Sequence, residues 1–208
     1  PILLASDVLH HSNHVFLSGE GAMEFARQRG LKIEPDDYFF SQYRYDQWQA
    51  IKNTDGSALD HGGTPEQIKD KKFGTVGAVA CDVNGHIAAA TSTGGMTNKK
   101  WGRIGDSPLI GAGTYASDAT CAISCTGHGE VFIRAVAAYD VSCLMAYKGL
   151  TLQQAMDVVV NDKLVKMEGE GGMIGVDAQG NAAMVFNSLG MYRGVISSSG
   201  LHQVAIYG

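Results

Sequence analysis

The sequence has little proline, little charge and no long hydrophobic run. Only 4 of its 208 residues are proline, and 18% are charged. No apolar stretch approaches the roughly 18–20 residues that a membrane-spanning helix needs. Acidic residues outnumber basic ones by 21 to 16, and no basic stripe is present, which argues against binding to nucleic acid. We therefore expect neither a nucleic-acid nor a membrane partner.

Closely spaced cysteines are also missing. Cys81, Cys121, Cys125 and Cys143 each stand in an apolar stretch, and no two of them form a Cys-x-x-Cys pair. A zinc site needs tighter pairing with histidine neighbours, so we predict no metal site. Reduced, mostly buried thiols are typical of cytosolic proteins, and the start of the chain does not resemble a signal peptide. The expected location is the cytoplasm.

Glycine, by contrast, is abundant. The chain has 27 glycines among 208 residues, close to twice the average share of about 7%. No glycine triplet repeats, which excludes a collagen-like chain. Hydrophobic residues make up 45%, enough for a buried core. The glycines are therefore expected at turns and at close backbone approaches.

The first third of the chain has helical patterns, and the remainder has strand patterns. Helices are expected at 1–12, 21–29 and 37–52, with a short β-prone stretch at 14–17. Residues 53–74 are polar and rich in turn signals, which indicates a flexible linker.

Beyond that linker, Asn84-Gly85 is a strong hairpin signal between expected strands at 75–83 and 86–92. Further strands are expected at 109–115, 119–125, 173–177, 183–187 and 203–207, and helices at 127–147 and 152–166. The second of these helices has Thr151 as its N-cap. Antiparallel hairpins around a helix pair predict an α+β fold with helices outside stacked sheets.

The junction Gly74-Thr75 has two interpretations. It is either an ordinary entry into a strand or a cleavage site that leaves threonine at a new N-terminus. In the second case the free α-amine, with a pKa near 8, is the base that activates the threonine hydroxyl. Before cleavage the same hydroxyl can attack the Gly74 carbonyl, where the missing Cβ eases a strained peptide.

Three further blocks favour the second interpretation, namely Thr91–Lys99, Gly102–Pro108 and Ser124–Glu130. With the segment Gly74–Ala80 they resemble, in the same order, the plant-type asparaginase and isoaspartyl peptidase family. The resemblance also includes Gly19–Ala22 and the segment Phe186-Asn187 to Gly190-Met191-Tyr192. It implies an N-terminal-nucleophile hydrolase with a four-layer αββα sandwich.

The resemblance also implies a role for each matching residue. Thr75 is the nucleophile, freed by cleavage after Gly74, and Thr93 is the second threonine that orients it. Arg103 binds the substrate α-carboxylate, and Asp106 binds the α-ammonium group. Thr126 and Gly127 form the oxyanion hole, and Gly129 lines the head-group site. Taken singly, Arg103 with Asp106 could be a solvated ion pair, and Thr126-Gly127 a plain helix cap.

The expected organisation follows from the same resemblance. Residues 1–74 correspond to the latter part of the family's first subunit, and residues 75–208 form the second subunit of the same domain. The family's opening strand and sodium-binding loop have no counterpart in residues 1–74, so we expect a gap or an exposed sheet edge and poor activity from this polypeptide alone. No cofactor is expected to be required, and structural sodium is implied only by the resemblance. A dimer of two-subunit units is the expected assembly.

The expected activity is hydrolysis of L-asparagine and of β-aspartyl dipeptides through a Thr75 acyl-enzyme. These substrates share one head group, so the residues do not rank them. Two alternatives remain open at this point. One is a glycosylasparaginase-like hydrolase, and the other is an uncleaved, non-catalytic scaffold of the same fold.

Overall fold

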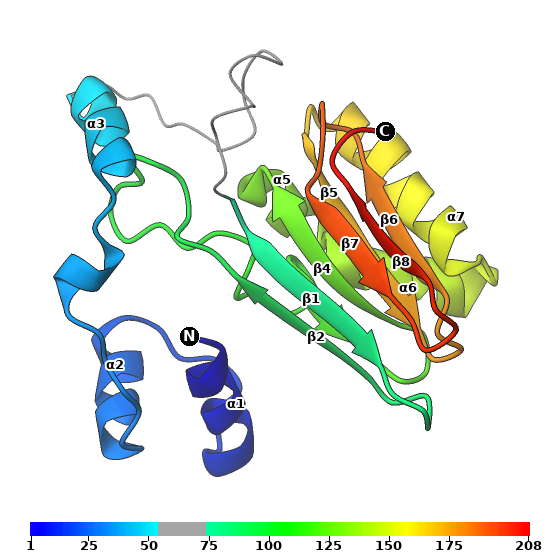
Figure 1. Cartoon of the computed structure of the whole chain (residues 1–208), viewed down its shortest axis with the longest axis horizontal. Coiled ribbons are helices and arrows are strands. Elements are labelled where there is room, and N and C mark those ends of the chain that lie inside the picture. The colour runs from blue at the N-terminus through cyan, green and yellow to red at the C-terminus, as the bar shows by residue number, and fades with distance from the viewer. Residues whose placement is uncertain (54–73) are drawn as a thin grey trace. The chain divides into compact units, whose positions relative to one another are not determined.

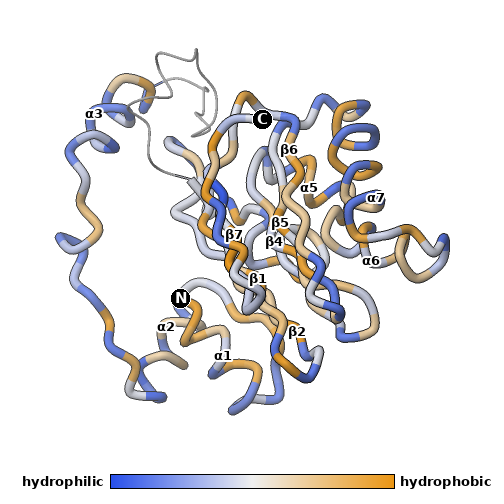
Figure 2. Tube along the Cα trace, turned by 45° about the vertical axis from the view of Figure 1, so that its right-hand side comes forward, coloured by the Kyte–Doolittle hydropathy of each residue, from blue (hydrophilic) through white to orange (hydrophobic). Residues whose placement is uncertain are grey.

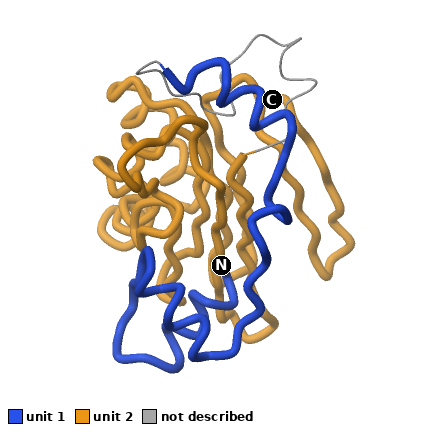
Figure 3. Tube along the Cα trace, turned by 90° about the vertical axis from the view of Figure 1, so that its left-hand side faces the viewer, with its two compact units in different colours: residues 1–56 blue, residues 57–208 orange. Residues whose placement is uncertain are grey.

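The computed structural model describes residues 1–53 and 74–208 (Figure 1). The chain divides into two compact units, residues 1–56 and residues 57–208 (Figure 3). Almost all of the expected linker, 53–74, lies outside the described residues, and the expected subunit boundary at Gly74-Thr75 stays a prediction. No helix in the described part of the chain is long and apolar enough to cross a membrane.

The first unit is helical, as expected. It contains α1 (Ile2–His11), α2 (Gly19–Gln28), the 3-10 helix η1 (Asp36–Phe39) and α3 (Gln42–Ile51). The strand expected at 14–17 is wrong. The Ser12 hydroxyl donates to the Val8 carbonyl at 2.7 Å and accepts from the His14 backbone N–H at 3.0 Å. This turn ends α1 and leads into an irregular segment before α2.

The expected helix at 37–52 is also divided. Phe40 takes an extended backbone conformation between η1 and α3, so the helical hydrogen bonds stop there and begin again after Ser41. No side chain of α3 is buried. Arg29 and Asp7, whose Nε and Oδ2 atoms are 3.1 Å apart, join α2 to α1.

The second unit begins with the expected hairpin. Strands β1 (Val76–Cys81) and β2 (Ile87–Ser92) pair antiparallel along their whole length. Gly85 has φ +81° in the turn, a conformation that glycine adopts without strain. A four-stranded antiparallel sheet follows in the order β3 (Thr114–Ala116), β4 (Cys121–Gly127), β5 (Gly171–Asp177) and β6 (Ala182–Phe186). A second hairpin, β7 (Arg193–Ile196) and β8 (His202–Ala205), ends the chain.

Two strand predictions need correction. The strand expected at 109–115 is mostly a turn, because the Leu109 backbone N–H donates to Asp106 O and the Ala112 N–H donates to Leu109 O. Only Thr114 and Tyr115 of that range enter β3. The strand β7 was not expected at all, and it pairs with the expected final strand, which begins one residue earlier and ends at Ala205.

The helices of the second unit differ from expectation in two places. The helix expected at 127–147 is two helices, α5 (Gly129–Ala135) and α6 (Ala137–Lys148), because Val136 between them is left-handed with φ +48°. The helix expected at 152–166 begins as α7 (Leu152–Asp157) and continues as the π-helix η2 (Val158–Leu164). Thr151 is the N-cap, in a reciprocal capping box with Gln154.

The core of the second unit lies between these helices and the four-stranded sheet. Ile123, Phe132 and Met156 are fully buried there, and α7 alternates between hydrophilic and hydrophobic residues along its length (Figure 2). The β1–β2 hairpin packs on β4 and β5, opposite the helices. Helices, sheet and second sheet are three of the four expected layers. The α+β class is confirmed, and the fourth layer stays a prediction.

Candidate active site

Thr75 stands at the entrance of β1, directly after the exposed Gly74. Its own side chain is half-buried. The β1–β2 ladder ends with Val76 paired to Ser92, so Thr75 directly precedes β1 and Thr93 directly follows β2 at the same end of the hairpin. The Thr93 hydroxyl oxygen accepts a hydrogen bond from the Gly95 backbone N–H at 3.0 Å. The two threonines singled out in the sequence therefore flank the same end of the β1–β2 hairpin.

The start of β1 lies near the end of β4. A Cβ on Gly77 would be 2.0 Å from Ser124 Oγ, so this close approach of β1 to β4 requires glycine. At the opposite end of the hairpin, the Ile87 backbone N–H donates to Asp118 Oδ1, just before β4, at 2.9 Å. Strands β1 and β4 therefore run in opposite directions, which can be followed in Figure 1. Thr75 is thus brought toward the last residues of β4.

Those last residues are Thr126 and Gly127. Gly127 has φ +143° and pairs with Gly171 of β5, which has φ +153°. A Cβ on Gly127 would lie 2.7 Å from the Gly171 Cα, and a Cβ on Gly171 would lie 2.8 Å from the Gly127 Cα. The two backbones are in direct contact, and neither position has room for a side chain.

The two predicted head-group residues meet at Gly129, the first residue of α5. A Cβ on Gly129 would lie 2.7 Å from Arg103 Nη2 and 2.8 Å from Asp106 Oδ1. The absence of that atom lets the guanidinium and the carboxylate approach one backbone position. Three of the predicted site residues are therefore brought together, although Gly129 is distant in sequence from the other two.

Gly113 connects this charged pair to β4. A Cβ on Gly113 would lie 2.7 Å from Asp106 Oδ2, and the Gly113 carbonyl accepts from the Cys125 backbone N–H at 2.9 Å. Thr126 is the next residue after Cys125 in β4. Asp106 therefore lies beside the end of β4. The predicted head-group residues and the predicted oxyanion residues thus belong to one corner of the second unit.

Asp106 is buried, with only 5% of its surface exposed. Within the described residues, its Oδ2 atom and the Ser107 hydroxyl are buried without a hydrogen-bond partner. Burial raises the pKa of the Asp106 carboxyl to about 6, although the positive charge of Arg103 acts in the opposite direction. A buried carboxylate oxygen without a partner is suited to receive a cationic group.

Glu130 is a member of the site to which the sequence assigned no role. Its carboxylate accepts two hydrogen bonds from Arg103, Nε to Oε1 and Nη2 to Oε2, each at 2.7 Å. These bonds hold the pKa of the Glu130 carboxyl below its usual range. His128 Nε2 lies 3.7 Å from Glu130 Oε2. One sequence signal could have indicated this role. Glu130 is an acidic residue directly after Gly127-His128-Gly129, and a carboxylate is the natural partner for the arginine of the block Gly102–Pro108.

Comparison with known protein families agrees with this geometry. The profile of a family described as "Asparaginase" matches residues 1–206. The chain belongs to the asparaginase family. The resemblance of the four sequence blocks is thereby confirmed.

The relatives of this asparaginase-family chain include bacterial and plant proteins. The isoaspartyl peptidase of Escherichia coli (strain K12) is 53% identical over 193 residues, which cover 93% of this chain and 60% of that protein. The isoaspartyl peptidase of Salmonella typhimurium is 54% identical over 193 residues, 93% of this chain and 61% of that protein. A probable isoaspartyl peptidase/L-asparaginase 2 of Arabidopsis thaliana is 42% identical over 226 positions, 100% of this chain and 68% of that protein. The chain spans about 60% of the length of its bacterial relatives.

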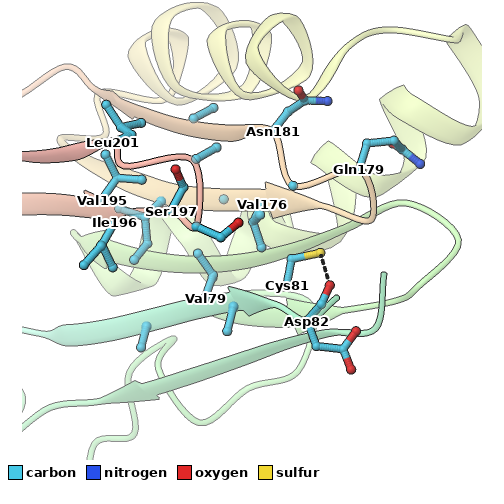
Figure 4. A pocket seen from close by; sticks show the side chains of 18 of the residues that line it. Val79, Cys81, Asp82, Val176, Gln179, Asn181, Val195, Ile196, Ser197 and Leu201 are labelled. Carbon is cyan, nitrogen blue, oxygen red and sulfur yellow. Dashed lines mark hydrogen bonds between the residues drawn. The ribbon is translucent and has the colours of Figure 1, made fainter. Parts of the chain in front are cut away.

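A cavity of about 1170 Å³ lies elsewhere in this asparaginase-family chain (Figure 4). It is lined by β1, β5, β6 and the segment from β7 to the following loop, with Val79, Val176 and Val195 among its residues. None of the predicted site residues lines it. Within the described residues, β1 pairs with β2 alone, so its other edge is unpaired and faces this cavity. The cavity is thus separate from the predicted site residues, and the expected gap stays a prediction.

Metal-binding side chains do not gather in the described part of the chain. No three His, Cys, Asp or Glu residues of 1–53 and 74–208 form a group that could hold a metal ion. All four cysteines have free thiols, and burial raises the pKa of Cys121 to about 11. The expectation that no cofactor is required stays a prediction.

Proposed function

We propose that the protein is an autoproteolytically activated amidohydrolase that cleaves L-asparagine to L-aspartate and ammonia and hydrolyses β-aspartyl dipeptides. The observation that carries the proposal is the meeting of Arg103 and Asp106 at Gly129, beside the ends of β1 and β4. The names of the bacterial and plant relatives, isoaspartyl peptidase and isoaspartyl peptidase/L-asparaginase, support the same substrate class.

Opposite charges at one backbone position suit an amino-acid head group. Asp106 receives the α-ammonium group at its Oδ2 atom, and the Arg103 guanidinium receives the α-carboxylate. Glu130 accepts from the Nε atom and from one hydrogen of the Nη2 atom of Arg103, so the substrate carboxylate binds the remaining N–H groups of the guanidinium. A peptide with its α-amine and α-carboxylate in amide bonds lacks both charges, so the proposal excludes ordinary α-peptides.

Activation requires a break in the chain between Gly74 and Thr75. The Thr75 hydroxyl attacks the Gly74 carbonyl and forms an ester as the peptide nitrogen leaves as the amine. Water hydrolyses that ester, which restores the hydroxyl and leaves Gly74 with a carboxylate. The new α-amine of Thr75 then serves as the general base for its own hydroxyl.

Hydrolysis follows in two steps. The Thr75 hydroxyl attacks the β-carbonyl of the bound substrate while its α-amine takes the proton, and the Thr126 hydroxyl and Gly127 N–H stabilise the oxyanion. The protonated amine passes its proton to the leaving nitrogen, which departs as ammonia or as an amino acid. Water then attacks the acyl-enzyme ester and releases L-aspartate. Thr93, at the same end of the hairpin as Thr75, orients the nucleophile.

The remaining partner and location assignments belong to this proposal. We assign a small-molecule substrate, a dimer of two-subunit units and a cytoplasmic location, the last supported by the four free thiols. The sodium implied by the resemblance has no acidic or histidine ligand group in residues 1–53 and 74–208, and no step above uses it.

The decisive experiment compares the protein with its Thr75→Ala variant. On a denaturing gel the unsubstituted protein should convert to two fragments, one ending at Gly74 and one beginning at Thr75, and should release ammonia from L-asparagine. Thr75→Ala should stay intact and inactive, whereas the control Thr151→Ala should cleave and turn over. A single intact band after long incubation would favour the scaffold. Turnover of N-acetylglucosaminyl-asparagine without turnover of L-asparagine would favour the glycosylasparaginase.

A further inference from the structure

Asn187, directly after β6, holds three separate segments of the second unit together. Its Oδ1 accepts from the Gly171 backbone N–H at 2.8 Å. Its Nδ2 donates to the carbonyl oxygens of Gly169 at 3.0 Å and Val160 at 3.1 Å. Its backbone N–H donates to the Gly171 carbonyl at 2.9 Å. None of these hydrogen bonds involves a predicted head-group residue, and the proposed reaction gives Asn187 no role.

These bonds clamp Gly171 on both of its polar atoms. The Gly171 N–H donates to the Asn187 side chain, and the Gly171 carbonyl accepts from the Asn187 backbone N–H, so both polar groups of Gly171 are directed to the residue that directly follows β6. In an antiparallel sheet, both polar groups of one residue point to the same side. Gly171 therefore faces β6, and its pairing with Gly127 on the other side is of the close, non-hydrogen-bonded kind.

The same alternation sets the direction of the Gly127 N–H. Because Gly171 offers it no acceptor, the Gly127 N–H points away from β5. Two residues earlier on the same strand, the Cys125 N–H points to that side and donates to Gly113 O. Gly113 is also the residue that lies against Asp106. The Gly127 N–H is thus aimed into the corner where the substrate head group is proposed to bind.

The position of Gly127 depends on Gly171 by direct contact. The glycine pair has no side chain between the strands, and a Cβ on either residue would lie 3.0 Å from Phe132 Cε2. No side chain lies between the two backbones that could change its conformation, so a displacement of Gly171 also displaces Gly127. On the far side, Asn187 ties Gly171 to Val160 of the π-helix η2, a rare element that is frequent at functional sites.

We propose that Asn187 is a positioning residue for the oxyanion hole. It fixes Gly171, Gly171 fixes Gly127, and the Gly127 N–H is thereby held in the direction of the developing oxyanion. This inference rests on the proposed function for its catalytic consequence, and on the hydrogen-bond geometry for its structural one. A donor that is fixed in advance stabilises the transition state more than the ground state, so the effect belongs in kcat.

The test substitutes the amide while keeping its shape. Asn187→Asp retains the Oδ1 acceptor but sets a carboxylate oxygen against the Gly169 and Val160 carbonyls. Asn187→Ala removes all three side-chain bonds. Asn161→Ala is the matched control, since Asn161 is an exposed residue of the same π-helix and donates only to Asp157 Oδ1, at 3.2 Å.

With L-asparagine, and with rates divided by the amount of cleaved Thr75 terminus, both Asn187 variants should lose about 10- to 100-fold in kcat. Their KM and their affinity for L-aspartate as a competitive inhibitor should stay within about twofold, because Arg103 and Asp106 are not touched. Unchanged kcat, or an equal loss of kcat and aspartate affinity, would overturn the proposal.

Amide hydrogen exchange tests the structural link without any turnover. In Asn187→Ala the Gly171 and His128 amides should exchange at least about tenfold faster, whereas the Cys125 amide, bonded to Gly113, should not change. If the unsubstituted protein hydrolyses no asparagine, the proposed function fails and this exchange result still decides the positioning. Unchanged exchange at Gly171 and His128 refutes it.

Discussion

The buried carboxylate of Asp106 lowers the free energy of unfolding at neutral pH, and it is also the group proposed to bind the substrate. Its buried carboxyl has a pKa of about 6 in the folded protein, against an ordinary value of 3.8. Between about pH 4 and pH 6 the folded state therefore binds more protons than the unfolded chain does. The free energy of unfolding falls as the pH rises through that window and stays lower above it. The ionised carboxylate is the form that an α-ammonium group would pair with.

Asp106→Asn should separate these two effects. Removing the buried charge should raise the free energy of unfolding at pH 7 by about 1–3 kcal/mol. The KM for L-asparagine should rise at least about tenfold, since a charge-assisted bond is lost. In the unsubstituted protein, KM should increase as the pH falls below about 6, and the variant should lack that dependence. Urea unfolding and kinetics at several pH values measure both. A less stable variant with unchanged KM would contradict the expectation.

Glu130 has a separate role at the same scale. Glu130→Gln keeps one acceptor but removes the charge that holds the Arg103 fork through two bonds. We expect KM for L-asparagine to rise about tenfold, by the loss of about 1.4 kcal/mol of binding, with kcat within about twofold. Asp140→Asn breaks a comparable ion pair with Lys163 outside the site and serves as the control. A loss confined to kcat would show that Glu130 does not act through substrate binding.

Single residues were predictable from sequence where motifs or local chemistry carry them. Asn84-Gly85 and Thr151 act on their immediate neighbours, and both predictions are confirmed. Glu130 and Asn187 could not be assigned in this way, because their partners lie 27 and 16 residues away. Such pairings depend on how β4, β5 and α5 meet, and no local pattern specifies that.

At the scale of elements, the break between α5 and α6 has a visible local cost. Val136 is left-handed with φ +48°, a conformation that costs a β-branched residue about 1–2 kcal/mol. Val136→Gly should raise the free energy of unfolding by up to about 1 kcal/mol, because glycine adopts this conformation freely. The loss of the valine contact with Gly111 offsets part of that gain.

Val136→Ala is the control for that prediction, because alanine keeps the left-handed cost and also loses the contact. Its free energy of unfolding in urea should therefore not exceed that of the unsubstituted protein. If the glycine variant is the less stable of the two, backbone strain is not the dominant effect at this position.

The same break explains why one helix was expected where two occur. Apolar residues continue through 131–141 without a proline or a glycine, so nothing in the pattern ends a helix at Val136. The turn is imposed from outside, since the Ala138 and Tyr139 N–H groups donate to Ala112 O and Gly111 O of another segment. Strand β7 was missed for a related reason, since it is only four residues long and pairs only with β8 in the described part.

At the scale of the whole molecule, β1 has an edge that pairs with no other strand of the described residues. The Asp82 N–H donates to His86 O across the hairpin, so alternation directs the amides of Ala78 and Ala80 to β2. The amides of Gly77 and Val79 then face the cavity. We expect Gly77 and Val79 to exchange their amide hydrogens at least about tenfold faster than Ala78 and Ala80. Equal protection along β1 would mean that its second edge is covered.

The order of hairpins and helices predicts helices outside stacked sheets, whereas the four-layer αββα arrangement was implied by the family resemblance. Hairpins around a helix pair indicate the α+β class, but stacking of the β1–β2 hairpin on β4 depends on single close approaches such as that of Gly77 to Ser124. The predicted poor activity of this polypeptide alone, like the fourth layer, stays a prediction.

The contact between Gly127 and Gly171 also limits how this protein can change. Each position lacks room for even one methyl group, and enlarging both at once makes the collision worse. In a saturation mutagenesis library selected for function, both positions should therefore tolerate no substitution, and no pair of substitutions should rescue them. The backbone contact that fixes the direction of the Gly127 N–H therefore prevents this part of the protein from changing by single substitutions.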